Sequence, residues 1–136
     1  MMISAELLKN LPVLFCGLLF AILFIQSGLD KVFNYKGNLE WLTGHFEKSP
    51  LKGTVGMMLP VLTFMEVGTG VLSAVGVVYF LVGGSLMLLF AAGALGAATL
   101  LALFFGQRMA QDYPGAASLV PYFFVALLLM YLSVPR

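Results

Sequence analysis

A single charged side chain, Glu66, stands alone in a long apolar stretch of this sequence. Residues 53–107 contain no other charged residue. The whole chain is 61% hydrophobic and 10% charged, whereas soluble domains are about half apolar and about a quarter charged. The sequence therefore predicts an integral membrane protein, with the lipid bilayer as its first partner.

Four segments have the length and polarity of membrane-spanning helices. A helix needs about 20 apolar residues to cross a bilayer, and we expect spans at about residues 11–28, 57–76, 79–106 and 117–134. The uncharged stretch after Glu66 is too long for one span, so we place a break near Gly76, with Gly83 and Gly84 as the alternative. In lipid every backbone polar group must be paired within the protein. The expected fold is thus all-α, with residues 1–136 forming a single membrane domain, a four-helix bundle.

The first apolar segment has the length of a membrane span rather than of a signal peptide. Residues 10–29 carry no charge, whereas the apolar core of a signal peptide has about 7–15 residues. We therefore expect this segment to remain in the protein as its first span.

A polar segment, residues 30–56, separates the first two spans. Within it, Leu39, Leu42 and Phe46 have helical spacing, and Trp41 is an aromatic residue of the kind found at membrane interfaces. This pattern predicts a short amphipathic helix at the lipid headgroups. An ordinary solvated loop is the alternative.

Four spans place both termini on one side of the membrane and the two longer connections on the other. Five of the seven lysine and arginine residues belong to residues 30–56 and 107–116. The positive-inside rule therefore favours a cytoplasmic location for the 30–56 loop, by a small margin. The net charge of +1 gives no field that would attract nucleic acid.

The residue types exclude several kinds of site. Cys16 is the only cysteine and lies in an apolar run, so it can form no intrachain disulfide and no CxxC redox pair. We interpret it as apolar filler. His45 is the only histidine, so we expect no transition-metal site made of protein ligands alone and no covalently bound cofactor.

Glu66 is the centre of the candidate site. A charged residue at the middle of a membrane helix costs about 2.5–3.5 kcal/mol on insertion scales, and such residues usually face the bundle interior. Thr63, Gly70 and Ser73 share its helix face, so we expect this face to point inward. We favour a proton-handling role, with Arg108 as a candidate partner. The alternative is a protonated, structural Glu66 that donates a hydrogen bond to a carbonyl.

Further polar side chains at the loop side of the spans are candidate ligand-binding residues. They are Gln26, Asp30, Lys31, Arg108, Asp112 and Tyr113. Gln26 and Asp30 share a helix face. We expect the third span to continue as a helix to residue 112, so that Arg108 lies over Asp112, and we interpret the two as a helix-end ion pair in preference to a functional pair. For Lys31 the alternative is a side chain that only extends to the headgroups.

Three runs of the sequence resemble the DoxX family of small bacterial four-helix membrane proteins: FIQSGLDKVFNY, MEVGTGVLSAVG and FFGQRMAQDYPGAASLVPYFFVALLLMYL. Gly28 and Lys31 match the glycine and lysine that close the first helix of the family. Glu66, followed by Gly68 and Gly70, matches the glutamate of its second helix. The resemblance covers nearly the whole chain.

The resemblance implies a bacterial inner-membrane protein associated with redox chemistry. Some relatives are described as subunits of quinone-linked sulfur oxidation, and others as scaffolds for redox-stress enzymes. We therefore expect a membrane subunit of a redox-associated, quinone-linked complex, with protein partners and with Glu66 as an intramembrane acidic site. Electrons and any thiol chemistry would come from a partner, and no enzymatic activity is assigned. The alternatives are a non-catalytic packing or anchoring subunit and a carrier for a small solute or protons.

Overall fold

The computed structural model describes residues 5–134 and is entirely helical outside its turns and loops. Its elements are α1 (Ala5–Lys9), α2 (Leu11–Phe33), α3 (Tyr35–His45), α4 (Val55–Gly83), α5 (Met87–Met109) and α6 (Tyr113–Ser133). Within this range α2, α4, α5 and α6 are long and apolar enough to cross a membrane. The all-α class and the expected number of spanning-length helices are therefore confirmed.

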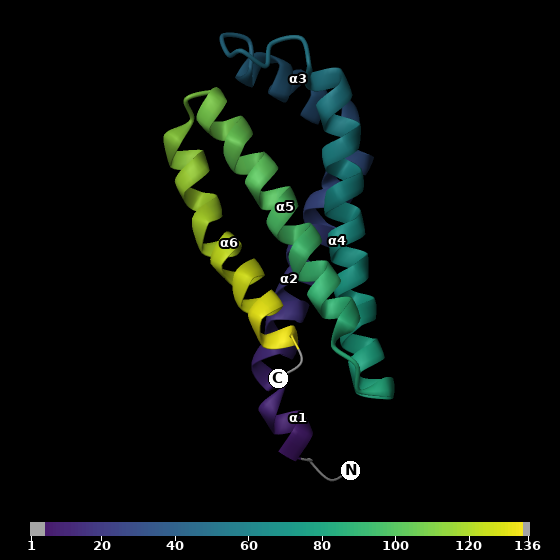
Figure 1. Ribbon diagram of the computed structural model, residues 1–136. Coiled ribbons are helices and arrows are strands. Elements are labelled where there is room, and N and C mark those ends of the chain that lie inside the picture. Colours follow the sequence, from purple (N-terminus) through teal and green to yellow (C-terminus); the bar gives the residue numbers. More distant parts are fainter. Residues whose placement is uncertain (1–4, 135–136) are drawn as a thin grey trace.

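The four long helices pack side by side (Figure 1). Helix α2 packs on α4, α4 on α5, and α5 on α6, while α2 also contacts α6. Helix α3 lies across one end of this group, next to the connection between α5 and α6. Helix α1 and the last turns of α6 lie at the opposite end. We call the first of these the α3 end.

The break between α4 and α5 lies at Gly83 and Gly84, the alternative position, and not near Gly76. Helix α4 continues through Gly76, where we expected the break, and ends at Gly83. Gly84 caps the helix with a φ of 77°, a left-handed conformation that glycine adopts without steric cost. Gly76 instead packs on α5, because a Cβ there would lie 3.1 Å from Leu89. Both glycines are visible in the sequence, but only packing shows that one serves contact and the other the turn.

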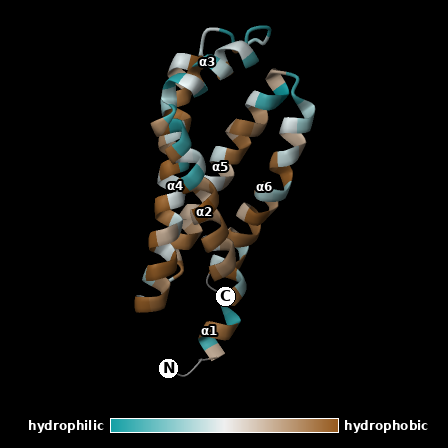
Figure 2. Cartoon of the chain, turned by 180° about the vertical axis from the view of Figure 1, so that it is seen from behind, coloured by the Kyte–Doolittle hydropathy of each residue, from teal (hydrophilic) through white to brown (hydrophobic). Residues whose placement is uncertain are grey.

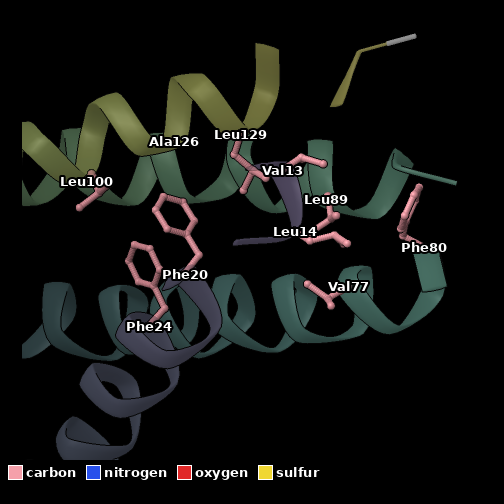
Figure 3. Packing of buried hydrophobic residues seen from close by; sticks show 10 residues of the cluster. All are labelled: Val13, Leu14, Phe20, Phe24, Val77, Phe80, Leu89, Leu100, Ala126 and Leu129. Carbon is pink, nitrogen blue, oxygen red and sulfur yellow. The ribbon is translucent and has the colours of Figure 1, made fainter. Parts of the chain in front are cut away.

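The apolar core lies between the four long helices (Figure 3). Phe20 and Phe24 of α2 meet edge to face with ring centroids 5.1 Å apart. Both rings are almost completely buried, as are Leu100 of α5 and Leu129 of α6. A Cβ at Gly96 of α5 would lie 2.6 Å from the Phe20 ring. A small residue at position 96 therefore allows this ring to fill the centre of the bundle.

Hydrophobic residues predominate along the long helices (Figure 2), and many of their large apolar side chains are exposed. Phe15, Phe64, Val82 and Phe124 are among the most exposed of them. Hydrophilic residues instead gather in α1, in α3 and in the connections at the α3 end. Large exposed apolar surfaces of this kind are typical of chains covered by lipid or by partner proteins.

Helix α3 confirms the helix expected within residues 30–56. Leu39 and Leu42 are partly buried, and Phe46, which caps the helix, is buried. Trp41 lies on the other side of α3 and is 62% exposed. The helix thus has an inward apolar face and an outward aromatic residue.

Candidate functional site

Glu66 lies inside the bundle, where α4 faces α2. Only 2% of the residue is exposed, and Thr63, Gly70 and Ser73 on the same face are buried as well. The Ser73 hydroxyl donates a hydrogen bond of 2.6 Å to the carbonyl of Gly17 in α2. The inward orientation of this polar stripe is therefore confirmed, and the stripe faces α2.

The charged partner of Glu66 is Lys31 of α2. The Lys31 Nζ lies 2.9 Å from Glu66 Oε2. Ser27, one turn earlier on α2, donates from its Oγ to the same carboxylate oxygen at 3.1 Å. Lys31 Nζ in turn donates to Ser27 Oγ at 3.1 Å. The three side chains thus form a closed triangle of polar contacts, which we call the Glu66 triad.

Two glycines bring α2 and α4 close enough to form the triad. A Cβ at Gly28 would lie 2.5 Å from Val67 Cγ2 and 3.0 Å from the Val67 backbone nitrogen. A Cβ at Gly70 would lie 2.6 Å from the backbone nitrogen of Ile25. Small residues allow such close backbone approach between membrane helices. The glycines on both sides of the triad therefore set the distance across which Lys31 reaches the carboxylate.

The triad balances charge within a poorly solvated interface. The side chain of Glu66 is 3% exposed and that of Lys31 is 16% exposed. Removing a carboxylate from water costs several kcal/mol, and an adjacent ammonium and hydroxyl offset this cost. Of the two charged groups, Lys31 is the one that stays in contact with the surroundings.

Arg108, the candidate partner named from the sequence, lies elsewhere. Within residues 5–134, the polar side-chain contacts of Glu66 are those to Lys31 and Ser27. Arg108 follows Gln107 near the end of α5, and its guanidinium carbon lies 4.5 Å from the ring centroid of Tyr113. That distance is typical of a cation–π contact.

The expected ion pair between Arg108 and Asp112 is wrong. Helix α5 ends at Met109, and Gln111 adopts a positive φ of 60°, so Asp112 does not lie one turn above Arg108. Asp112 is instead the N-cap of α6 and accepts a hydrogen bond of 3.0 Å from the backbone nitrogen of Gly115. An N-cap aspartate satisfies a backbone donor that the helix leaves free.

Gln26 and Asp30 also lie outside the triad. Both are exposed on α2. Asp30 Oδ2 is 3.4 Å from the side-chain nitrogen of Asn38 in α3, and its backbone oxygen lies at the same distance from that nitrogen. Asp30 therefore helps to position α3 against α2. Of the six candidate ligand-binding residues, only Lys31 contacts Glu66.

A second polar cluster joins α3 to the connection between α5 and α6. His45 Nε2 lies 2.7 Å from Gln107 Oε1 and 3.6 Å from Asp112 Oδ2. The His45 ring stacks on Trp41 with centroids 4.6 Å apart and meets Phe46 edge to face. We call His45, Gln107 and Asp112 the His45 cluster. This cluster is hard to predict from the sequence, because His45 and Gln107 are 62 residues apart and share only their place on the polar loop side.

An apolar groove of about 380 Å³ lies between α3, α4 and α5. Leu42 of α3 and Phe46, which directly follows α3, line it, together with Met65 of α4 and Leu103 of α5. Gln107 of the His45 cluster is its one lining residue with a polar side chain. Glu66, Lys31 and Ser27 do not line it, so the groove and the triad are separate features.

Cys16 and the acidic residues offer no further centre. Cys16 is partly buried and packs against the apolar core, as expected for filler. In the part of the chain that the structure describes, no three His, Cys, Asp or Glu side chains come together as a metal site would require. The triad is thus the only buried carboxylate site in that part of the chain.

Comparisons with protein-family models, with curated proteins and with solved structures find no match in any of the three. The resemblance to the DoxX family therefore stays a prediction.

Proposed function

We propose that this chain is a four-span integral membrane protein of the DoxX type that serves as a subunit of a redox-associated complex in a bacterial inner membrane. Its functional centre is the Glu66 triad, which exchanges protons. The observation that carries this proposal is the buried contact of 2.9 Å between Glu66 and a lysine that remains partly exposed. Ionisable residues inside membrane helices are usually functional, because they are costly to place there.

Membrane insertion is supported by the four apolar helices and by the many exposed apolar side chains that they carry. Each of these helices exceeds the length of about 20 residues that a bilayer requires. In the proposed orientation α3 lies at the cytoplasmic interface with Trp41 toward the headgroups, because most lysine and arginine residues lie at that end.

The geometry of the triad suits proton exchange. A proton that moves from Lys31 Nζ to Glu66 Oε2 converts an ammonium and a carboxylate into an amine and a carboxylic acid. The net charge of the pair is zero before and after this transfer, so no isolated charge is created in the apolar interior. Ser27, which contacts both groups, holds them in place. Lys31 exchanges protons with water at the α3 end.

The resemblance to the DoxX family also implies a link to quinone, and this link has less support than the acidic site at Glu66. A quinone head requires an apolar slot with a few converging polar groups. Gln26 is exposed, while Arg108 and Tyr113 contact each other near the start of α6. These residues do not converge with Glu66, so a quinone link depends on the resemblance. The redox centre itself would belong to a partner subunit.

One observation favours a second function, that of a packing or anchoring subunit. The backbones of α2 and α4 approach closely at Gly28 and Gly70, and the triad lies in this tight interface. The apolar groove between α3, α4 and α5 does not extend to the triad. In this alternative the ion pair only fixes α2 against α4.

A charge swap distinguishes the two functions. Lys31→Glu combined with Glu66→Lys keeps opposite charges in contact, which is all that a structural link requires. The swap places the lysine at the buried position and the carboxylate at the partly exposed one. Proton exchange at the triad requires the opposite arrangement. We expect normal membrane abundance and thermal stability, and a loss of redox activity of the co-purified complex of about a hundredfold or more.

The matched control is the same swap at two exposed residues of α3, Lys36→Glu with Glu40→Lys. This control should leave activity unchanged. If the swap at the triad retains full activity, the proton-exchange proposal is wrong and the anchoring function takes its place.

A further inference from the structure

We propose that the groove between α3, α4 and α5 binds an uncharged, single-chain amphiphile whose head carries a hydroxyl group, such as a monoacylglycerol. The acyl chain lies in the groove and the head lies at the His45 cluster. This inference does not depend on the proposed function, because the residues of the Glu66 triad do not line the groove.

The shape of the groove fits an acyl chain. Its volume of about 380 Å³ falls within the range of about 300–1,000 Å³ that is typical of small-molecule sites. Its lining on α4 extends from Val55 to Met65, or about 15 Å along the helix at 1.5 Å per residue. Leu42 of α3 and Phe46, which directly follows α3, also line it. The groove is therefore long and apolar.

The side chains of the groove can adapt to a flexible chain. Met57, Met58 and Met65 all line it. Methionine is unbranched and polarizable and fills irregular spaces, so it is common at surfaces that accept varied apolar ligands. A chain of methylene groups therefore fits this lining better than a rigid ring system does.

The polar part of the groove specifies the head. Gln107 is the one lining residue with a polar side chain, and its Oε1 accepts a hydrogen bond from His45 Nε2 at 2.7 Å. An amide oxygen has two lone pairs, so Gln107 Oε1 can accept a second hydrogen bond from a ligand hydroxyl. His45 fixes the position of this acceptor.

The polar groups at the groove and at the His45 cluster favour a hydroxyl head over a phosphate or a quinone. None of the residues that line the groove is a lysine, arginine, aspartate or glutamate, and the His45 cluster, where the head lies, contains the Asp112 carboxylate, which would repel an anionic phosphate. A quinone presents two carbonyl acceptors on opposite sides of a ring and needs donors at both. The Nε2 donor of Gln107 can reach at most one of these carbonyls, whereas a hydroxyl head can both accept from Nε2 and donate to Oε1.

Photocrosslinking of the full chain tests the site. The protein is placed in phosphatidylcholine nanodiscs and irradiated with a monoacylglycerol that carries a diazirine in its chain, and the labelled positions are mapped by mass spectrometry. We expect label on the α4 and α5 residues of the groove. Ala102→Phe should lower this label about tenfold, because the ring occupies the volume that the chain requires.

Ala98→Phe is the matched control, since Ala98 is exposed one turn away on α5 and does not line the groove. It should leave the label unchanged. Ala102 is itself exposed at the groove, so its replacement disturbs no core packing. Equal labelling of both variants and the parent chain, spread over lipid-facing positions such as Phe64, would mean only general lipid contact and would overturn the proposal.

Competition on the unaltered chain tests the head group without any substitution. Unlabelled monoacylglycerol should remove the label, whereas phosphatidic acid and decylubiquinone at the same concentration should not. Stronger competition by phosphatidic acid or by decylubiquinone than by monoacylglycerol would overturn the assignment of an uncharged hydroxyl head.

Discussion

Glu66 is held by residues of a different helix, and the sequence around it does not reveal them. Its burial and inward orientation could be predicted, because a carboxylate surrounded by apolar residues has few other options. Its partner could not, because several cationic residues lie near the same end of the spans. Lys31 is selected by the close approach of α2 and α4 at Gly28, which is a property of packing rather than of local pattern.

Gly28→Ala should destabilise the protein. The added Cβ would lie 2.5 Å from Val67 Cγ2 and 3.0 Å from the Val67 backbone, and overpacking of this kind costs about 1–3 kcal/mol. Gly56→Ala is the control on α4, since a Cβ there meets nothing within 4 Å. Thermal unfolding in detergent should show a lower midpoint for the first variant only. A normal midpoint for Gly28→Ala would mean that α2 and α4 do not approach so closely.

The ion pair should show strong coupling in a double-mutant cycle. Lys31→Met leaves a buried carboxylate without its counter-charge, and breaking such a pair costs about 3–5 kcal/mol. Lys31→Met combined with Glu66→Leu should recover most of this loss, because apolar replacements of buried pairs are often neutral. Unfolding free energies in detergent measure the cycle. Additive losses from the two substitutions would show that the side chains do not interact.

At the scale of helices, composition predicted more than local motifs did. The four helices of spanning length follow from apolar segments of about 20 residues, a signal spread over many side chains. The break near Gly76 was wrong because a glycine can serve either a turn or a close helix contact. The ion pair of Arg108 with Asp112 was wrong because it assumed that α5 continued past Met109. Helix ends depend on one or two backbone angles, which composition does not determine.

The turn between α4 and α5 offers a test at this scale. Gly84 has a left-handed backbone, so Gly84→Ala should cost about 1–2 kcal/mol of stability. Gly83 is the last residue of α4, and a Cβ there meets only Tyr79 at ordinary contact distance. Gly83→Ala should therefore be neutral or slightly stabilising. Equal effects of the two substitutions on thermal stability would contradict the position of the turn.

At the scale of the whole molecule, the apolar exterior and the polar α3 end predict how the chain lies in a membrane. On a Cys16→Ser background, single cysteines at Lys48 and Gln111 should react with a membrane-impermeant maleimide from the same side. A cysteine at Glu6 should react from the other side only. The reason is topological: with four crossings, the α2–α4 and α5–α6 connections, which both lie at the α3 end, are in one compartment. Labelling of positions 48 and 111 from opposite sides would contradict four spans.

The most direct test of the central claim is an infrared difference spectrum of Glu66 in membranes that contain the assembled complex. Spectra of the oxidised and reduced states are compared for the parent chain and for Glu66→Gln. If the triad exchanges protons, a carboxylic acid C=O band changes with redox state in the parent chain and is absent from the Glu66→Gln spectrum. An active complex whose redox difference spectrum is identical for the two chains in this region would contradict the claim.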